Sequence, residues 1–209
     1  MADIDYSLYV VTANRDDMHR THQDIAMAAA LGGATVVQFR DKDMDNELFV
    51  ETAVETAKIA GSNGVAFIVN DRAGQAVAAD ADGIHIGQRD MALSDVRKIV
   101  GEDMVIGVSA SSFTEATLAV AIGADYLGVG PIFPTDTKTD ASEPIGLAEL
   151  RRICEAVNIP VVAIGGINES NIAEVRAAGA SGAAVISYVA DAPDMIEAVR
   201  KLKKAWGRT

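Results

Sequence analysis

A short unit recurs along the chain and limits the folds that it can adopt. A helix-like stretch ends in Gly or Ala, a small or acidic residue follows, and a short apolar run comes next. The unit precedes the runs at 35–39, 83–87, 126–130 and 182–186. Glycine at a helix end, followed by an apolar run rich in β-branched residues, is typical of a helix that leads into a buried strand. The repetition therefore predicts stacked strand–helix modules.

Eight such apolar runs occur in all. They are 7–13, 35–40, 65–70, 83–87, 104–109, 126–131, 160–165 and 182–187. Strands that are apolar throughout are typical of a parallel sheet covered by helices. The 209 residues allow about 26 residues for each unit, enough for a strand, a helix and short loops. We therefore predict a single (β/α)8 TIM barrel domain over 1–209; an open Rossmann-like sheet is less favoured because no G-x-G-x-x-G follows the first run.

The stretch 46–60 illustrates the helices expected between the runs. Apolar side chains alternate there with Glu and Lys at helical spacing. The apolar residues are Leu48, Val50, Val54, Ala57 and Ile59. The pattern predicts an amphipathic helix over 46–60.

Charge and cysteine content narrow the functional classes. The chain has 18 Lys+Arg and 30 Asp+Glu, a net charge of −12, which argues against nucleic acid or an anionic membrane as a partner. Its single cysteine, Cys154, excludes an intramolecular disulfide and a cysteine-based zinc site. No apolar run reaches 18 residues, and no signal peptide is expected from the acidic stretch 1–5. We expect a cytoplasmic protein.

The polar residues that follow the strands are the candidate site residues, because the active sites of such barrels lie at the carboxyl ends of the strands. The second run ends in Gln38, Phe39, Arg40, Asp41 and Lys42. Arg40 and Lys42 are two residues apart, so both can point toward the barrel mouth. A guanidinium and an ammonium group at one site suit a diphosphate. A solvated charged loop is the alternative.

Carboxylates follow the next two runs. Asn70 and Asp71 end the third run, and Asp90 lies shortly after the fourth. Mg²⁺ takes few protein carboxylates and completes its shell with water and substrate phosphate, so Asp71 and Asp90 could form a magnesium site. Alternatively, each aspartate could cap the helix that follows it.

The last strands predict a phosphate site. The Gly165–Gly166 exit of the seventh run and Ile186–Ser187 after the eighth resemble the phosphate-binding loops of this barrel class. The irregular stretch 133–145 adds Thr135, Asp136, Thr137 and Lys138, whose hydroxyls and ammonium group suit phosphate oxygens.

The remaining candidates are a serine and three histidines. Ser109 ends the fifth run without a G-x-S-x-G elbow, so it is expected to make a hydrogen bond rather than act as a nucleophile. His85 lies within the fourth run and is expected to be a satisfied barrel residue with no catalytic role. His19 and His22 are expected at the surface.

Taken together, these motifs resemble the thiamine phosphate synthase family over roughly Leu8 to Val189. The matching segments are 37–42, 70–72, 83–90, 107–109, 128–135 with 137–138, 164–167 and 185–187. Members of this family are Mg²⁺-dependent transferases that join hydroxymethylpyrimidine diphosphate to a thiazole phosphate and release diphosphate. The resemblance implies phosphorylated small-molecule substrates and a dissociative displacement that needs no protein nucleophile.

The resemblance also implies a role for each matching position. The pyrimidine diphosphate would contact Gln38, Phe39, Arg40, Asp41, Lys42, Asn70, Ser109 and Lys138. The thiazole phosphate would contact Thr135, Asp136, Thr137, Gly166, Ile186 and Ser187. Asp71 and Asp90 would hold Mg²⁺, and the catalytic cations would be Arg40, Lys42 and Lys138.

Two positions differ from the family pattern, and two alternative functions stay open. Asp41 stands where glutamate is common in the family, and Ser111 stands where many relatives have histidine. One rival is a thiazole tautomerase on the same barrel; tautomerases tend to lack the residues matching Lys42 and Asp90 and to have Gly-His in place of Gly130-Pro131. The other rival is a non-catalytic barrel that binds thiazole phosphate or thiamine phosphate.

Overall fold

Strands and helices alternate along the chain in the computed structural model, which describes residues 4–135, 137 and 143–207. The strands are β1 (Leu8–Val11), β2 (Val36–Phe39), β3 (Ala66–Asn70), β4 (Gly83–Ile86), β5 (Val105–Ala110), β6 (Tyr126–Val129), β7 (Val161–Ile164) and β8 (Gly182–Val185). The helices are α1 (His22–Gly32), α2 (Asn46–Ser62), α3 (Ala73–Ala78), α4 (Leu93–Val100), α5 (Phe113–Ala121), α6 (Gly146–Ala156), α7 (Ile172–Ala177), α8 (Ser187–Ala190) and α9 (Met195–Trp206), with a short 3₁₀ turn, η1 (Asp16–Met18).

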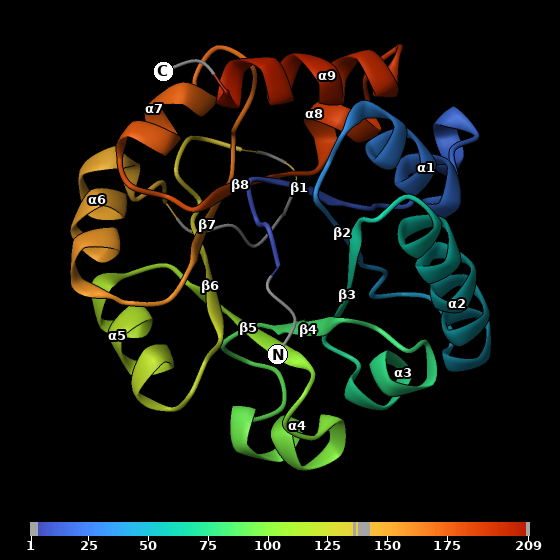
Figure 1. The fold of residues 1–209 in the computed structure, drawn as a ribbon, viewed down its shortest axis with the longest axis horizontal. Coiled ribbons are helices and arrows are strands. Elements are labelled where there is room, and N and C mark those ends of the chain that lie inside the picture. The colour runs from blue at the N-terminus through green and yellow to red at the C-terminus, as the bar shows by residue number, and fades with distance from the viewer. Residues whose placement is uncertain (1–3, 136, 138–142, 208–209) are drawn as a thin grey trace.

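The strands form a closed parallel barrel in sequence order, with the helices around it (Figure 1). The barrel closes where Leu8 of β1 is in register with Ala183 of β8. This pairing excludes an open sheet and confirms the predicted (β/α)8 fold. Every strand overlaps its predicted apolar run, and β5 extends one residue further, to Ala110. That 1–209 forms one domain stays a prediction, since both ends lie outside the described residues.

Two apolar layers hold the barrel together. Alternate strand residues such as Val10, Val37 and Phe39 pack outward against the helices. Their neighbours Tyr9, Val36 and others fill the inside of the barrel. Because successive side chains of a strand point to opposite faces, residues on both faces of the strands are buried. The continuous apolar runs of the sequence have this origin.

Helix α2 packs on the barrel through an apolar face that also includes two threonines. Phe49, Ala53 and Ala60 are fully buried, whereas Leu48 is 47% exposed. Val54, Ala57 and Ile59 are partly buried and pack against the core as well. Thr52 and Thr56 complete the buried face, and the Thr56 hydroxyl donates to the Thr52 carbonyl. Burial of Phe49 contributes about 1.5–3 kcal/mol. A threonine that satisfies its hydroxyl within its own helix can face the core.

Helix ends fix the positions of the loops around the barrel. The Thr21 and Asp24 side chains form a capping box at the start of α1, and Gly33, with φ of 94°, ends this helix in the left-handed conformation. The Ser112 hydroxyl caps α5 by accepting from the Glu115 N–H. Among the described residues, no helix has both the length and the apolar character needed to cross a bilayer.

Candidate active site

A cavity of about 580 Å³ opens at the carboxyl ends of the strands. It brings together most of the residues that the sequence singled out. Those that line it are Gln38, Arg40, Lys42, Asn70, Asp71, Asp90, Ser109, Thr135, Thr137, Gly166, Ile186 and Ser187. Asp136 and Lys138 lie outside the described residues.

Phe39 and Asp41 do not line the cavity, although they belong to the same segment as Gln38, Arg40 and Lys42. Alternation along the extended backbone explains the difference, since neighbouring side chains point to opposite faces. Phe39 is fully buried on the helix side. Its ring lies 4.7 Å from the His22 ring and 4.5 Å from the Phe49 ring.

His22 is buried, so its expected place at the surface is wrong. It is only 4% exposed. Its Nδ1 lies 2.7 Å from the Thr12 hydroxyl, and its Nε2 lies 3.1 Å from Oδ2 of Asp41. The histidine therefore bridges the end of β1 and the loop after β2. A position at the start of a helix indicates exposure only if no loop folds over it, and here the loop after β2 does so.

Asp41 organises the loop that carries Lys42. Its Oδ1 accepts hydrogen bonds from the backbone N–H groups of Asp43 and Met44 at 2.9 and 2.8 Å. Burial raises the pKa of Asp41, but the hydrogen bonds from Met44, Asp43 and His22 outweigh burial and hold the pKa below its ordinary value. Asp41 is therefore a charged anchor of the loop.

Arg72 fixes the same loop from its other side. Its guanidinium donates to the carbonyl of Met44 at 2.6 Å and lies 4.2 Å from the centre of the Phe49 ring. A planar guanidinium can make both kinds of contact at once. The loop after β2 is thus held by a histidine on one side and an arginine on the other.

Asp71 and Asp90 share a hydrogen bond between their carboxyl groups. Neither aspartate caps the helix that follows it. The N-cap residue of α3 is Arg72 and that of α4 is Ala92, and neither makes a side-chain capping hydrogen bond. Burial, together with the Asp90 carboxylate, raises the pKa of Asp71 to about 6. Burial also acts on Asp90, but the bonds from Asp71 and from the Gly87 N–H lower its pKa overall. Two carboxyl groups this close repel each other when both are ionised, and a cation between them would relieve that repulsion.

The opposite side of the cavity presents hydroxyls and backbone groups. The hydroxyl oxygens of Thr137 and Ser187 are 3.0 Å apart, and the Thr135 hydroxyl donates to the Thr137 hydroxyl at 3.2 Å. Gly166 has φ of 65°, and a Cβ there would lie 2.6 Å from the carbonyl oxygen of Pro134. Only glycine fits such close backbone contact at a positive φ. The loops after β6, β7 and β8 therefore meet here.

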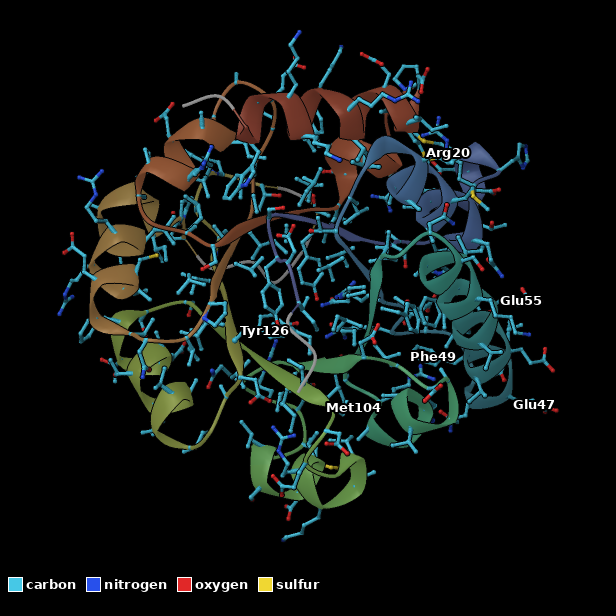
Figure 2. The ribbon with its side chains drawn as sticks, in the orientation of Figure 1. Arg20, Glu47, Phe49, Glu55, Met104 and Tyr126 are labelled. Atoms are coloured by element: carbon cyan, nitrogen blue, oxygen red, sulfur yellow. The ribbon has the colours of Figure 1, made fainter. Side chains whose placement is uncertain are left out.

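Sequence reasoning missed several residues of the cavity floor. Tyr9 and Tyr126 line the cavity, as does His85, which was expected only as a satisfied barrel residue. Tyr126, labelled in Figure 2, points into the barrel. The tyrosines stand within apolar runs, and because both faces of each strand are buried, the sequence does not indicate which face is the interior.

Ser109 and Ser111 are both fixed by named partners. The Ser109 hydroxyl lies 2.9 Å from Nε2 of His85, and its carbonyl accepts from the Gln88 amide at 2.6 Å. Ser111 donates to one carboxylate oxygen of Glu115 from its backbone N–H and its hydroxyl, at 2.6 and 2.8 Å. Both serine hydroxyls thus have a side-chain hydrogen-bond partner, His85 for Ser109 and Glu115 for Ser111.

Comparison with known proteins adds independent findings. The sequence profile of the thiamine monophosphate synthase family matches residues 8–189. The chain is 50% identical over 200 residues to the thiamine-phosphate synthase of Chloroflexus aurantiacus, covering 96% of this chain and 92% of that protein. It is 48% identical over 198 residues to that of Methanocella arvoryzae, covering 95% and 93%.

A solved structure is similar throughout its length. Thiamine phosphate pyrophosphorylase from Pyrococcus furiosus superimposes with a TM-score of 0.88 at 38% identity, covering 97% of this chain and 96% of that one. The family profile, the related sequences and the solved structure all match nearly the whole chain. The chain therefore belongs to the thiamine monophosphate synthase family of (β/α)8-barrel enzymes.

Proposed function

We propose that this enzyme joins hydroxymethylpyrimidine diphosphate to a thiazole phosphate, giving thiamine phosphate and diphosphate. The proposal is supported by the lining of one cavity, which contains two separate groups of polar side chains. Arg40, Lys42 and the carboxylate pair form one side, and the hydroxyls of Thr135, Thr137 and Ser187 form the other. Two phosphorylated substrates could lie there with their reacting ends toward each other.

Asp71 and Asp90 fit a magnesium ion. Burial and the neighbouring Asp90 carboxylate raise the pKa of Asp71, and a divalent cation would offset the repulsion between the two carboxylates. No cluster of three or more His, Cys, Asp or Glu side chains suited to a metal occurs among the described residues. That fits Mg²⁺, which binds through one or two carboxylates together with water and substrate phosphate. When bound, the cation would neutralise part of the charge on the departing diphosphate.

Arg40 and Lys42 would bind the same diphosphate. Both charges are near Asp71, whose pKa they lower, so a diphosphate held next to a cation at the carboxylate pair would also reach them. Their loop is anchored by Asp41 and Arg72. Prepositioned cations stabilise a leaving anion without reorganising during the reaction. The same role for Lys138 remains part of the proposal, although that residue lies outside the described part of the chain.

The chemistry would be a displacement at the methylene carbon of the pyrimidine. The bond from this carbon to the diphosphate oxygen breaks, and the diphosphate leaves with the electron pair. The aminopyrimidine ring stabilises the positive charge that remains, and the thiazole nitrogen then forms the new carbon–nitrogen bond. No protein nucleophile is required. Gln38, Asn70 and Ser109 would hold the ring while the phosphate side aligns the thiazole.

The acidic surface is compatible with these anionic substrates. The outer face of α2 carries exposed acids such as Glu47 and Glu55, which project from the rim of the molecule (Figure 2). Arg40 and Lys42 instead line the cavity. The net charge of −12 thus includes acids far from the mouth. A cytoplasmic location stays part of the proposal, based on the single cysteine, which suits a reducing compartment.

The test is product formation from both substrates. The purified enzyme would be mixed with hydroxymethylpyrimidine diphosphate and thiazole phosphate, with Mg²⁺ or with a chelator, and thiamine phosphate and diphosphate measured by chromatography. We expect equal amounts of both products, and only with Mg²⁺. Isomerisation of a carboxylated thiazole without diphosphate release would indicate a tautomerase. Binding without either reaction would indicate a sensor protein.

A further inference from the structure

A continuous hydrogen-bond chain crosses the floor of the cavity. It joins five side chains from five strands, all of which line the cavity. The links are Gln38 Nε2 to Tyr9 Oη at 2.7 Å, Tyr9 Oη to Tyr126 Oη at 3.0 Å, Tyr126 Oη to His85 Nδ1 at 3.0 Å and His85 Nε2 to Ser109 Oγ at 2.9 Å. We call this set the floor chain.

One end of the floor chain has a fixed direction. The Gln38 amide nitrogen can only donate, so the Tyr9 oxygen must accept its hydrogen. A phenol has one hydrogen, and that of Tyr9 is then available for Tyr126. Burial raises the pKa of Tyr9 and Tyr126 above the ordinary value of tyrosine. Both phenols therefore keep their single hydrogen at neutral pH.

The same reasoning extends to the other end. Either oxygen of the Tyr9–Tyr126 pair could donate. The Tyr9 hydroxyl is buried, and among the described residues Tyr126 is the acceptor within reach of its hydrogen, so we assign Tyr9 as the donor. The hydrogen of Tyr126 then points to Nδ1 of His85. The neutral ring must then carry its hydrogen on Nε2 and donate it to the Ser109 oxygen. The hydrogen of the Ser109 hydroxyl is then not used in any bond of the floor chain. Since the Ser109 hydroxyl has no second partner within the described part of the chain and lines the cavity, its hydrogen can point to a bound ligand.

Two glycines provide the space that the floor chain needs. A Cβ on Gly107 would lie 2.1 Å from Cζ of Tyr126, and a Cβ on Gly128 would lie 2.7 Å from Cε1 of His85. Real Cβ atoms do not approach other atoms so closely. Any other residue at either position would displace a ring of the chain. The rings are thus seated by the strands themselves rather than by mobile loops.

We propose that Gln38 sets the direction of the whole floor chain, so that His85 is held as the Nε2–H tautomer and Ser109 presents a hydrogen-bond donor to the cavity. This inference rests on the proposed function for its consequence: Ser109 would donate to an acceptor atom of the pyrimidine diphosphate. Tyr9, Tyr126 and His85 are then positioning residues that act through Ser109. Linked donors polarise one another, so the chain strengthens the last donor.

The tautomer can be read directly in the full-length enzyme without substrate. The enzyme would be labelled with ¹⁵N-histidine and studied by NMR at about pH 8.5, above the ordinary histidine pKa of about 6.5, where a neutral ring is favoured. The chain has three histidines, and a His85→Asn variant assigns the signal. We expect His85 to carry its hydrogen on Nε2. A hydrogen on Nδ1 would overturn the proposal.

Reversal at Gln38 provides a second, independent test. In Gln38→Glu the carboxylate can only accept, so Tyr9 should donate to it and every link should turn around. His85 should then carry its hydrogen on Nδ1. If the variant keeps the Nε2–H signal of the parent, Gln38 does not set the direction. This test needs no turnover, so its failure is distinct from a failure of the proposed function.

Kinetics test whether the tyrosine acts through the serine. We expect Tyr126→Phe and Ser109→Ala each to lower kcat/KM for the pyrimidine diphosphate about tenfold, the effect of one lost hydrogen bond. The double variant should lose little more than either single variant. If the losses of kcat/KM in the two single variants add up in the double variant, Tyr126 does not act through Ser109. The matched control is Tyr6→Phe, whose ring lies 4.7 Å from that of Tyr126 without a hydrogen bond in the floor chain.

Discussion

His22 and Asp41 meet in a buried contact behind the cavity wall, with Nε2 of the histidine 3.1 Å from Oδ2 of the aspartate. Their side chains are only 5% and 7% exposed. Asp41 lies between Arg40 and Lys42, which both line the cavity. The contact therefore ties helix α1 to the loop proposed to bind diphosphate.

Loss of this contact should affect both stability and binding. His22→Asn removes a ring that bridges Thr12 and Asp41, and the shorter side chain cannot reach both. We expect the free energy of unfolding to fall by about 1–3 kcal/mol, measured by urea denaturation, and the KM for the pyrimidine diphosphate to rise. The control is His19→Asn, because His19 is exposed at φ of 54°, a conformation that asparagine tolerates. Equal effects of the two variants would contradict the assignment.

Asp41 should make stability depend on pH. Its pKa is lowered from 3.8, so its stabilising effect is fully present above that value and is lost as the pH falls through the lower, folded-state pKa. The free energy of unfolding of the parent minus that of Asp41→Asn should be positive near pH 7 and shrink below about pH 4. Urea titrations across this range would measure the difference. A difference that stays constant with pH would mean that the charge of Asp41 does not matter.

Asp90→Asn should separate metal binding from stability. The amide oxygen can still accept from the Gly87 N–H, while one of two facing carboxylates is removed. We expect Mg²⁺ binding by calorimetry and turnover to be lost, with the metal-free melting temperature unchanged or higher. Asp103→Asn is the control, since this exposed residue precedes β5 at the far end of the barrel. An unfolded Asp90→Asn protein would show that the aspartate is structural.

Gly166→Ala should impair the phosphate side of the cavity. The added Cβ meets the Pro134 carbonyl, whereas Gly64 has a similar φ, 68°, with nothing within 4 Å. Both alanine variants should lose about 1 kcal/mol of stability from backbone strain. Only Gly166→Ala should also weaken thiazole phosphate binding, measured by calorimetry. Unimpaired binding in that variant would remove Gly166 from the proposed site.

The segment Gln38 to Lys42 shows how far sequence reasoning reached. Two-residue spacing correctly placed Arg40 and Lys42 on one face, and the same alternation puts Phe39 and Asp41 on the other. The resemblance named the segment as a whole and so included all five residues. Asp71 and Asp90 were expected near each other because β3 and β4 are neighbours, but only the folded chain shows their shared hydrogen bond.

The sequence by itself determined the barrel, because eight apolar runs separated by helices can bury both faces of a parallel sheet in few other ways. It also determined which loops would carry the polar residues. Only the tertiary structure decided which strand face became the interior, and thus that Tyr9, Tyr126 and His85 form the cavity floor. Both faces of the strands are buried, so side-chain direction depends on barrel closure and not on hydropathy. Contacts such as His22–Asp41 likewise join segments that only folding brings together.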